Sequence, residues 1–168
     1  MKAPKNRRVY VVGYEVATAL GNTFATTWQG AVDGQAGFRK LSRCQSTSRS
    51  NVVGEIPDWD PSQFPYVDRK EASLWNASYV FLTMEVCRRA LLHAGLEIND
   101  ETGPRMGCLI GSALNGTDSY RIAMDNYVNL GPLKVSPYLL PNVCANLPAG
   151  KAGMMMGLVT ATETEESA

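Results

Sequence analysis

The sequence has one histidine and no excess of charge of either sign. Sixteen acidic and sixteen basic residues cancel over 168 residues, so the chain carries no electrostatic footprint for nucleic acid and no polybasic face for anionic lipid. No apolar run approaches the roughly 20 residues that a membrane span needs. The apolar run Val9–Val12 is too short for a secretory signal. We therefore expect a cytoplasmic protein of about one domain.

Cysteine is sparse as well. Cys44, Cys87, Cys108 and Cys144 lie far apart and form no C-x-x-C pair, which is unlike a disulfide scaffold or a zinc site. We expect buried free thiols. His93 has no second histidine to share a metal with, and its position predicts a place near the C-terminal end of a helix. We expect neither a metal nor a cofactor.

Strands and helices alternate along the chain, which predicts an α/β fold with a mixed or parallel sheet. No repeat and no linker divides residues 1–168. Apolar, β-branched runs predict buried strands at Val9–Gly13 and Met106–Gly111, with a short strand at Val52–Ile56. The predicted helices cover 24–32 (after the Asn22-Thr23 cap), 68–94, 118–128 and two short pieces between 138 and 157, the second with Pro148 near its start.

The predicted helix 68–94 is unusual in its composition. Asp68–Glu71 has the form of a capping box, and Gly95 provides the stop. From Ala72 to Met84 there is no charged residue, and the apolar side chains surround the helix. Because a helix that is apolar all round is buried on all sides, we expect more protein around it than 168 residues supply.

Four segments, taken in order, resemble the β-ketoacyl-acyl carrier protein synthase (ketosynthase) family. Arg8–Asn22 is similar to the family's opening strand and turn, and Trp28–Gly37 to its first helix and exit. Arg105–Ser112 is similar to its third-strand motif. The most specific segment is Gly131–Asn142, which is followed by Asn146, Ala149-Gly150 and Gly157-Leu158. The likeness covers the whole chain but less than half of a family enzyme.

This resemblance implies a thiolase-like fold, layered αβαβα, of which residues 1–168 are the N-terminal half. In the complete enzyme, a cysteine at the N-terminus of a buried helix takes an acyl group from acyl carrier protein or coenzyme A. A malonyl-carrier unit is decarboxylated, and its carbanion attacks the acyl-enzyme to give a 3-oxoacyl product. Two histidines of the C-terminal half and backbone N–H groups assist.

By count, the nucleophile is expected immediately after Ala168. In the family it follows a Gly-Leu pair by a fixed short interval, and here that pair is Gly157-Leu158. Ser167-Ala168 stands where a small dipeptide precedes the nucleophile. The resemblance therefore implies that this chain contains neither the nucleophile nor the two histidines, and that it cannot perform the condensation alone.

The last segment departs from the family pattern. Thr160-Ala161 replaces the usual Gly-Pro, and Glu163, Glu165 and Glu166 fall in an expected central strand. Because buried carboxylates are costly unless paired, either this segment differs from its relatives or the end is exposed. One hypothesis is that Ala168 marks a processing point before a second chain that begins with the cysteine. A cloned fragment or chance proteolysis is the alternative.

Two pairs of residues match the acyl pocket of relatives. Ala113 and Leu114 match positions that line it near the nucleophile. Leu139 and Leu140 match the segment that reaches toward the partner subunit and caps its far end, and Leu139 stands where relatives often have an aromatic residue. These side chains would select acyl chain length by their bulk; plain core or dimer packing is the alternative for each.

Two functions stay open from the sequence. The chain is part of an active synthase that works with acyl carrier protein in fatty acid or polyketide synthesis, or it is a non-catalytic partner of the chain-length-factor type. Cysteine after Ala168 would favour the first and glutamine the second. The resemblance implies a homodimer or a ketosynthase-like heterodimer, with the Gly107 strand and the Tyr138 region near its interface.

Overall fold

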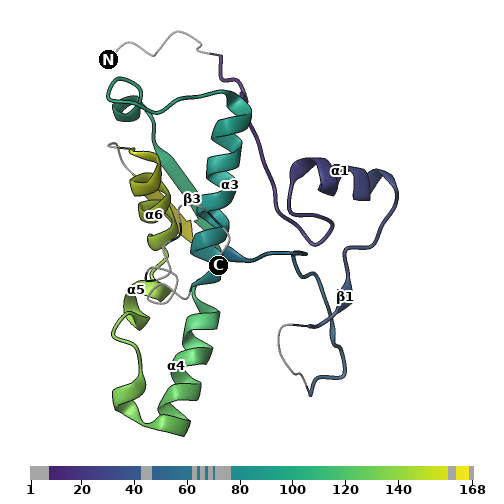
Figure 1. Cartoon of the computed structure of the whole chain (residues 1–168), viewed down its shortest axis with the longest axis vertical. Coiled ribbons are helices and arrows are strands. Elements are labelled where there is room, and N and C mark those ends of the chain that lie inside the picture. The colour runs from purple at the N-terminus through teal and green to yellow at the C-terminus, as the bar shows by residue number, and fades with distance from the viewer. Residues whose placement is uncertain are drawn as a thin grey trace.

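The computed structural model describes residues 8–42, 47–61, 64, 67, 70, 77–158 and the backbone of 162–166. The elements in chain order are α1 (Phe24–Val32), β1 (Arg39–Lys40), β2 (Val52–Val53), α3 (Ser78–Ala94), η2 (Gly103–Arg105), β3 (Cys108–Ser112), α4 (Thr117–Leu130), η3 (Pro132–Lys134), α5 (Leu139–Val143), α6 (Leu147–Met156) and β4 (Thr162–Glu166). Figure 1 shows a body of α3, β3 and α6, a lower lobe of α4 and α5, and an arm that carries α1 and β1.

The core lies where α3, β3 and α6 pack together. Val80, Phe81 and Met84 of α3 form one buried cluster with Cys108 of β3 and Ala152 of α6. Strand β3 pairs in parallel with β4, so that Cys108 lies opposite Thr162 and Ser112 opposite Glu166. Parallel neighbours need a long crossover connection, and α4 to α6 provide it. The predicted α/β class is confirmed.

Several sequence predictions are confirmed element by element. Thr23 caps α1 by accepting a hydrogen bond from the Thr26 backbone N–H at 3.2 Å. Val52-Val53 forms a strand that pairs antiparallel with β1. The strand ending in Gly111 and the helix ending before Gly131 are present as β3 and α4. Pro148 falls in the first turn of α6, where its missing N–H costs nothing, and the strand expected near the C-terminus is present as β4.

The predicted strand Val9–Gly13 is wrong for this structure. The run is extended but pairs with no described strand, and Val9 and Val11 are 93% and 85% exposed. A cavity of about 270 Å³, lined by Val12 and Gly13 and also by Ile110 of β3, lies beside it. The run is apolar enough for a buried strand, but the described residues supply no layer to cover it.

The helix predicted over 68–94 is not continuous in the described part of the chain: Lys70 is helical, but α3 begins only at Ser78. Ala77 is extended, with φ −95° and ψ 97°, which ends any continuous helix there. The proposed Asp68 capping box lies outside the described residues. In the described part of the stretch predicted to be apolar all round, Val80 and Phe81 are buried and Leu82 is half-buried. Beyond that stretch, Leu92 is 67% exposed. Gly95 ends the helix with φ +64°, as predicted.

The arm is tied to α3 through a buried carboxylate. Glu85 is 2% exposed and pairs with Arg88 at 2.8 Å and with Arg89 at 2.6 Å. Arg89 also donates to the Asn22 carbonyl at 2.6 Å. Two guanidinium groups compensate the buried charge, and the shared arginine holds the start of α1 against the body. His93 lies in the last turn of α3, as predicted, and accepts a hydrogen bond from the Tyr14 N–H at 3.2 Å.

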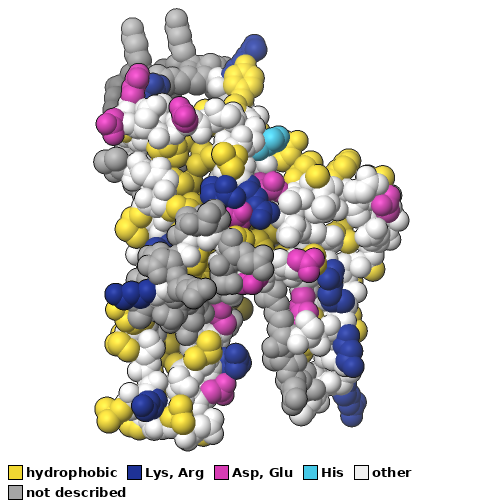
Figure 2. Space-filling model, in the orientation of Figure 1, with side chains coloured by type: hydrophobic (Ala, Val, Ile, Leu, Met, Phe, Trp, Pro, Cys, Tyr) yellow, Lys and Arg dark blue, Asp and Glu magenta, His cyan; other side chains and the backbone are white. Residues whose placement is uncertain are grey.

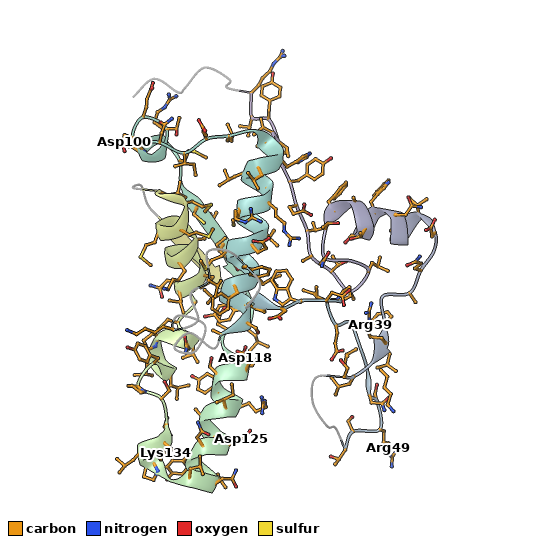
Figure 3. All side chains as sticks on the ribbon, in the orientation of Figure 1. Arg39, Arg49, Asp100, Asp118, Asp125 and Lys134 are labelled. Carbon is orange, nitrogen blue, oxygen red and sulfur yellow. The ribbon has the colours of Figure 1, made fainter. Side chains whose placement is uncertain are left out.

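The N-terminal ends of α3 and α4 meet the end of α5 in one place, which we call the α3–α4–α5 junction. Asp118 of α4 accepts hydrogen bonds from the Ser78 N–H and hydroxyl at 2.8 and 2.7 Å. The Tyr79 hydroxyl lies 3.1 Å from the Asn142 carbonyl. Gly116 precedes α4 with φ +59°, and a Cβ there would lie 2.5 Å from the same carbonyl oxygen. Figure 3 shows Asp118 between α3 and α4.

Three of the cysteines are described, and all three are free thiols. Cys108 is buried and Cys87 half-buried, whereas Cys144 is exposed, so the prediction of buried thiols is wrong for Cys144. Burial raises the pKa of Cys87 to about 11, and the neighbouring Cys108 thiol, to which it hydrogen-bonds, contributes. Burial also raises the pKa of Cys108. Cys44 lies outside the described residues.

In the part of the chain that the structure describes, no helix is both long enough and apolar enough to cross a membrane.

The thiols are predicted to differ in reactivity. With a pKa of about 11, about one Cys87 in a thousand is a thiolate at pH 8, and the thiolate is the reactive form. We expect iodoacetamide to modify Cys87 at least about ten-fold more slowly than Cys144, measured by peptide mass spectrometry over time. The rates should converge in denaturant. Equal rates in the native protein would contradict the described environment of Cys87.

Gly116→Ala is predicted to destabilise the chain more than Gly34→Ala. Both glycines have positive φ, but nothing lies within 4 Å of a Cβ at Gly34, whereas a Cβ at Gly116 meets the Asn142 carbonyl. Backbone strain costs each variant about 1 kcal/mol. We expect the steric contact to add at least about 1 kcal/mol for Gly116→Ala, measured by urea denaturation. Equal losses in the free energy of unfolding for the two variants would show that α5 moves away from a Cβ at position 116 without cost.

Candidate functional site

The two predicted pairs of pocket residues lie on either side of the α3–α4–α5 junction. Ala113 and Leu114 are in the turn between β3 and α4, and both are exposed, Leu114 by 78%. Leu139 is half-buried and Leu140 is 73% exposed at the start of α5. The junction therefore connects the two segments, although the pairs come from positions about 25 residues apart in the sequence.

Backbone packing at Gly116 sets the distance between these segments. Gly116 comes two residues after Leu114, and Asn142 comes two residues after Leu140. A Cβ at Gly116 would meet the carbonyl of Asn142 at 2.5 Å and the Cα of Val143 at 2.9 Å. Only glycine allows this approach, because other residues carry a Cβ and rarely adopt positive φ. The turn after β3 and helix α5 are thus in direct backbone contact.

Leu140, one of the predicted pocket residues, lines a groove. The groove lies between α5 and α6, has a volume of about 440 Å³ and is bordered by Leu140, Pro141, Cys144, Asn146, Leu147, Gly150, Lys151 and Met154. Its wall is mostly apolar, and among the described residues Lys151 is the charged one that lines it. An apolar groove of this kind accepts an aliphatic chain better than a polar ligand.

The described residues at this groove form a wall and not a reaction centre. The Cys144 thiol donates to the Leu140 carbonyl at 3.2 Å, which is a neutral oxygen of the main chain and not a general base. A nucleophile is activated by an adjacent base or a lowered pKa. Among the described residues, no group of three side chains able to ligate a metal comes together either.

The parallel pairing of β3 and β4 decides at which edge of the sheet β4 ends. Ser112 and Glu166 lie opposite each other in the register, and the carboxyl ends of parallel strands meet at one edge of a sheet. Ala113 and Leu114 follow Ser112 at that edge. The position after Ala168, where the nucleophile is expected, follows Glu166 by three residues. The register therefore puts the Ala113-Leu114 turn at the edge of the sheet where β4 ends.

The lower lobe exposes an apolar surface. Figure 2 shows hydrophobic side chains at its end, around α4, η3 and α5. Leu133 is 96% exposed and Val128 is 72% exposed. The other exposed apolar residues of this surface are Tyr120, Met124, Tyr127, Leu130 and Leu140. We call these seven residues the lower-lobe surface.

Sequence reasoning missed the residues that hold the predicted pocket segments in place. The sequence predicted Tyr79 only as one of many apolar residues in the helix 68–94. It predicted Asp118 only as the first residue of the helix 118–128. Their contacts join residues 40 to 65 positions apart. The local sequence does carry a sign of a special backbone at this place, because an Asn-Gly pair such as Asn115-Gly116 is typical of turns.

Comparison with known protein families gives a match over nearly the whole chain. The family described as "Beta-ketoacyl synthase, N-terminal domain" matches residues 6–168. The curated relatives include "3-oxoacyl-[acyl-carrier-protein] synthase 2" of Vibrio harveyi, 31% identical over 153 residues, and of Coxiella burnetii (strain RSA 493 / Nine Mile phase I), 30% identical over 155 residues. These alignments cover 90% and 92% of this chain but only 36% and 37% of the relatives. The chain thus spans little more than a third of their length.

Solved structures share the fold. "The ishigamide ketosynthase/chain length factor" superposes with a TM-score of 0.76 at 19% identity, over 94% of this chain and 38% of that one. A β-ketoacyl synthase from Burkholderia phymatum STM815 superposes with a TM-score of 0.67 at 15% identity, over 88% of this chain and 36% of that one. At these identities the likeness concerns the fold, which is mixed α/β and thiolase-like, and this chain covers only its N-terminal part. With the match over residues 6–168, it follows that this chain belongs to the β-ketoacyl synthase family, as its N-terminal domain.

Proposed function

We propose that residues 1–168 form the N-terminal portion of a 3-oxoacyl-acyl carrier protein synthase. The complete protein would condense an acyl thioester with malonyl-acyl carrier protein by decarboxylative Claisen chemistry. The observation that carries this proposal is the parallel β3–β4 pair. In this pair the Leu114 turn follows β3 at the edge of the sheet where β4 also ends, and a nucleophile that followed Ala168 would adjoin this turn in the proposed synthase.

In this proposal the chain binds and orients the acyl group, and the rest of the protein performs the bond changes. A cysteine after Ala168 would attack the acyl thioester as a thiolate and release the carrier thiol. Histidines of the C-terminal remainder would assist loss of CO₂ from the malonyl unit. Ala113 and Leu114 would line the pocket near the thioester, and Leu139 and Leu140 would bound its far end.

The partners are part of the proposal. Acyl carrier protein would deliver both substrates, and the C-terminal remainder would complete the site, either in the same polypeptide or as a separate chain. The lower-lobe surface supports a dimer, because exposed apolar patches of this kind are typical of protein interfaces. Both a homodimer and a ketosynthase-like heterodimer fit this surface.

A second function has one observation in its favour. One of the solved structures that share the fold is a ketosynthase/chain length factor. As a chain length factor, this chain would shape the product cavity of a catalytic partner without condensing anything itself. The apolar wall around Leu140 suits either function, so the residue after Ala168 and an activity assay must separate them.

The test uses the complete protein that contains this chain, purified with any second polypeptide. It is given acyl-carrier substrates of several lengths and malonyl-acyl carrier protein, and products are analysed by mass spectrometry. We expect a 3-oxoacyl product two carbons longer and one CO₂ per condensation, both abolished by prior alkylation of the cysteine after Ala168. Absence of product, together with a non-cysteine residue at that position, would favour the chain-length-factor function.

Leu114→Trp is predicted to shorten the acyl chain that the complete synthase accepts. The larger side chain would fill the pocket near the thioester, and each methylene excluded from an apolar pocket weakens binding about ten-fold or more. The measurement is kcat/KM for acyl substrates of increasing length. Leu92→Trp is the control, because Leu92 is 67% exposed on α3 outside the proposed pocket. An unchanged length preference in Leu114→Trp would remove Leu114 from the pocket.

A further inference from the structure

We infer that Tyr79 is a positioning residue that holds α5 in place and thereby determines which acyl chain lengths the site accepts. The inference rests on the proposed function, because it takes α5, with Leu139 and Leu140, to be the far wall of the acyl pocket. It adds a residue of α3 that touches neither substrate nor nucleophile. Tyr79 would act on specificity only through the position of α5.

The contact is a side-chain cap on a very short helix. Helix α5 has five residues, Leu139–Val143, and its last carbonyl groups have no partners within the helix. The Tyr79 hydroxyl lies 3.1 Å from the Asn142 carbonyl and 3.1 Å from the Cys144 carbonyl, so its one proton serves both acceptors. Helices of this length are not stable on their own. External contacts must therefore define where α5 lies, and this is one of them.

Tyr79 is itself held firmly. Its neighbour Ser78 donates two hydrogen bonds to Asp118, at 2.8 and 2.7 Å. This carboxylate serves as the cap that the extended Ala77 does not provide, and a negative charge is favourable at a helix N-terminus. The Tyr79 ring packs against the buried core cluster. The hydroxyl therefore projects from a helix end that is itself fixed, and its hydrogen bonds hold α5 at a defined position relative to α3.

The hydroxyl remains a donor over the working pH range. Burial raises the pKa of Tyr79 to about 12, and the electrostatic effects of Cys144 and Asp118 act in the same direction. Because both groups that it faces at α5 are carbonyl oxygens, only the protonated hydroxyl makes these hydrogen bonds. Because this pKa lies far above neutrality, the contact persists throughout the neutral pH range.

The groove beside α5 gives this contact a route to specificity. Leu140, Pro141 and Cys144 of the α5 segment face α6 across a groove of about 440 Å³. The Tyr79 hydroxyl contacts the C-terminal end of the same segment, at the carbonyls of residues 142 and 144. A shift of α5 relative to α6 changes the width of the groove directly, so loss of the hydroxyl would loosen one wall while leaving the opposite wall intact.

The test is Tyr79→Phe in the complete synthase, which removes the hydroxyl and keeps the ring that packs in the core. Two quantities are measured: amide hydrogen exchange of residues 139–147, and kcat/KM for a series of acyl-carrier substrates of increasing length. We expect faster exchange in this segment and a change of about three-fold or more in the ratio of kcat/KM between long and short substrates, the effect of about one hydrogen bond. Tyr10→Phe, at an exposed tyrosine of the N-terminal run, is the matched control.

Each other outcome overturns the inference. Unchanged exchange in residues 139–147 would mean that Tyr79 does not hold α5. Faster exchange with an unchanged length ratio, or an equal loss of kcat/KM at all lengths with a lower Tm, would leave Tyr79 with a structural role only. If the unmodified synthase makes no 3-oxoacyl product, the proposed function fails and the specificity role falls with it. The exchange data then still decide whether Tyr79 anchors α5.

Discussion

The carboxylate of Asp118 at the N-terminus of α3 is the contact on which the lower lobe depends. It replaces a cap that the local sequence of α3 lacks, since Ala77 has no side-chain acceptor. It also ties the first turn of α4 to the body. Once these two helix ends are joined, the close approach at Gly116 and the hydroxyl of Tyr79 leave α5 little freedom. The two pocket segments of the proposed synthase, Ala113-Leu114 and Leu139-Leu140, are therefore positioned by the α3–α4–α5 junction.

The hydrophobic core also depends mainly on one element. One helix, α3, supplies most of the large buried side chains, and β3 and α6 complete the cluster. Opposite the junction, buried Glu85 holds the arm through Arg89 and the Asn22 carbonyl. Two places on one helix, its N-terminus at Ser78 and its middle at Glu85 and Arg89, thus position two separate parts of the chain. The faces of α3 that these contacts leave half-buried, together with the exposed run Val9–Val12, agree with a chain that spans about a third of its relatives' length.

Local signals predicted elements well where the backbone itself carries the information. Gly95 at positive φ ends α3, and Pro148 sits in the first turn of α6. The same reasoning was wrong for Val9–Gly13 and for the start of α3. A strand needs a neighbour, and a helix start depends on which acceptor reaches its N–H groups. Neither can be read from composition, because both depend on residues far away in the sequence.

The sequence by itself determined the α/β alternation, the bounds of α1, the end of α3 and the family, since these follow from periodicity, turn residues and ordered motifs. It also marked Leu114 and Leu140 as candidates by resemblance. Only the tertiary structure decided how those segments are held: Asp118 bonds to a residue 40 positions earlier, and Tyr79 to carbonyls 63 and 65 positions later. A tyrosine in an apolar helix carries no local sign of its partner, because hydrogen bonds over such separations exist only after the chain has folded.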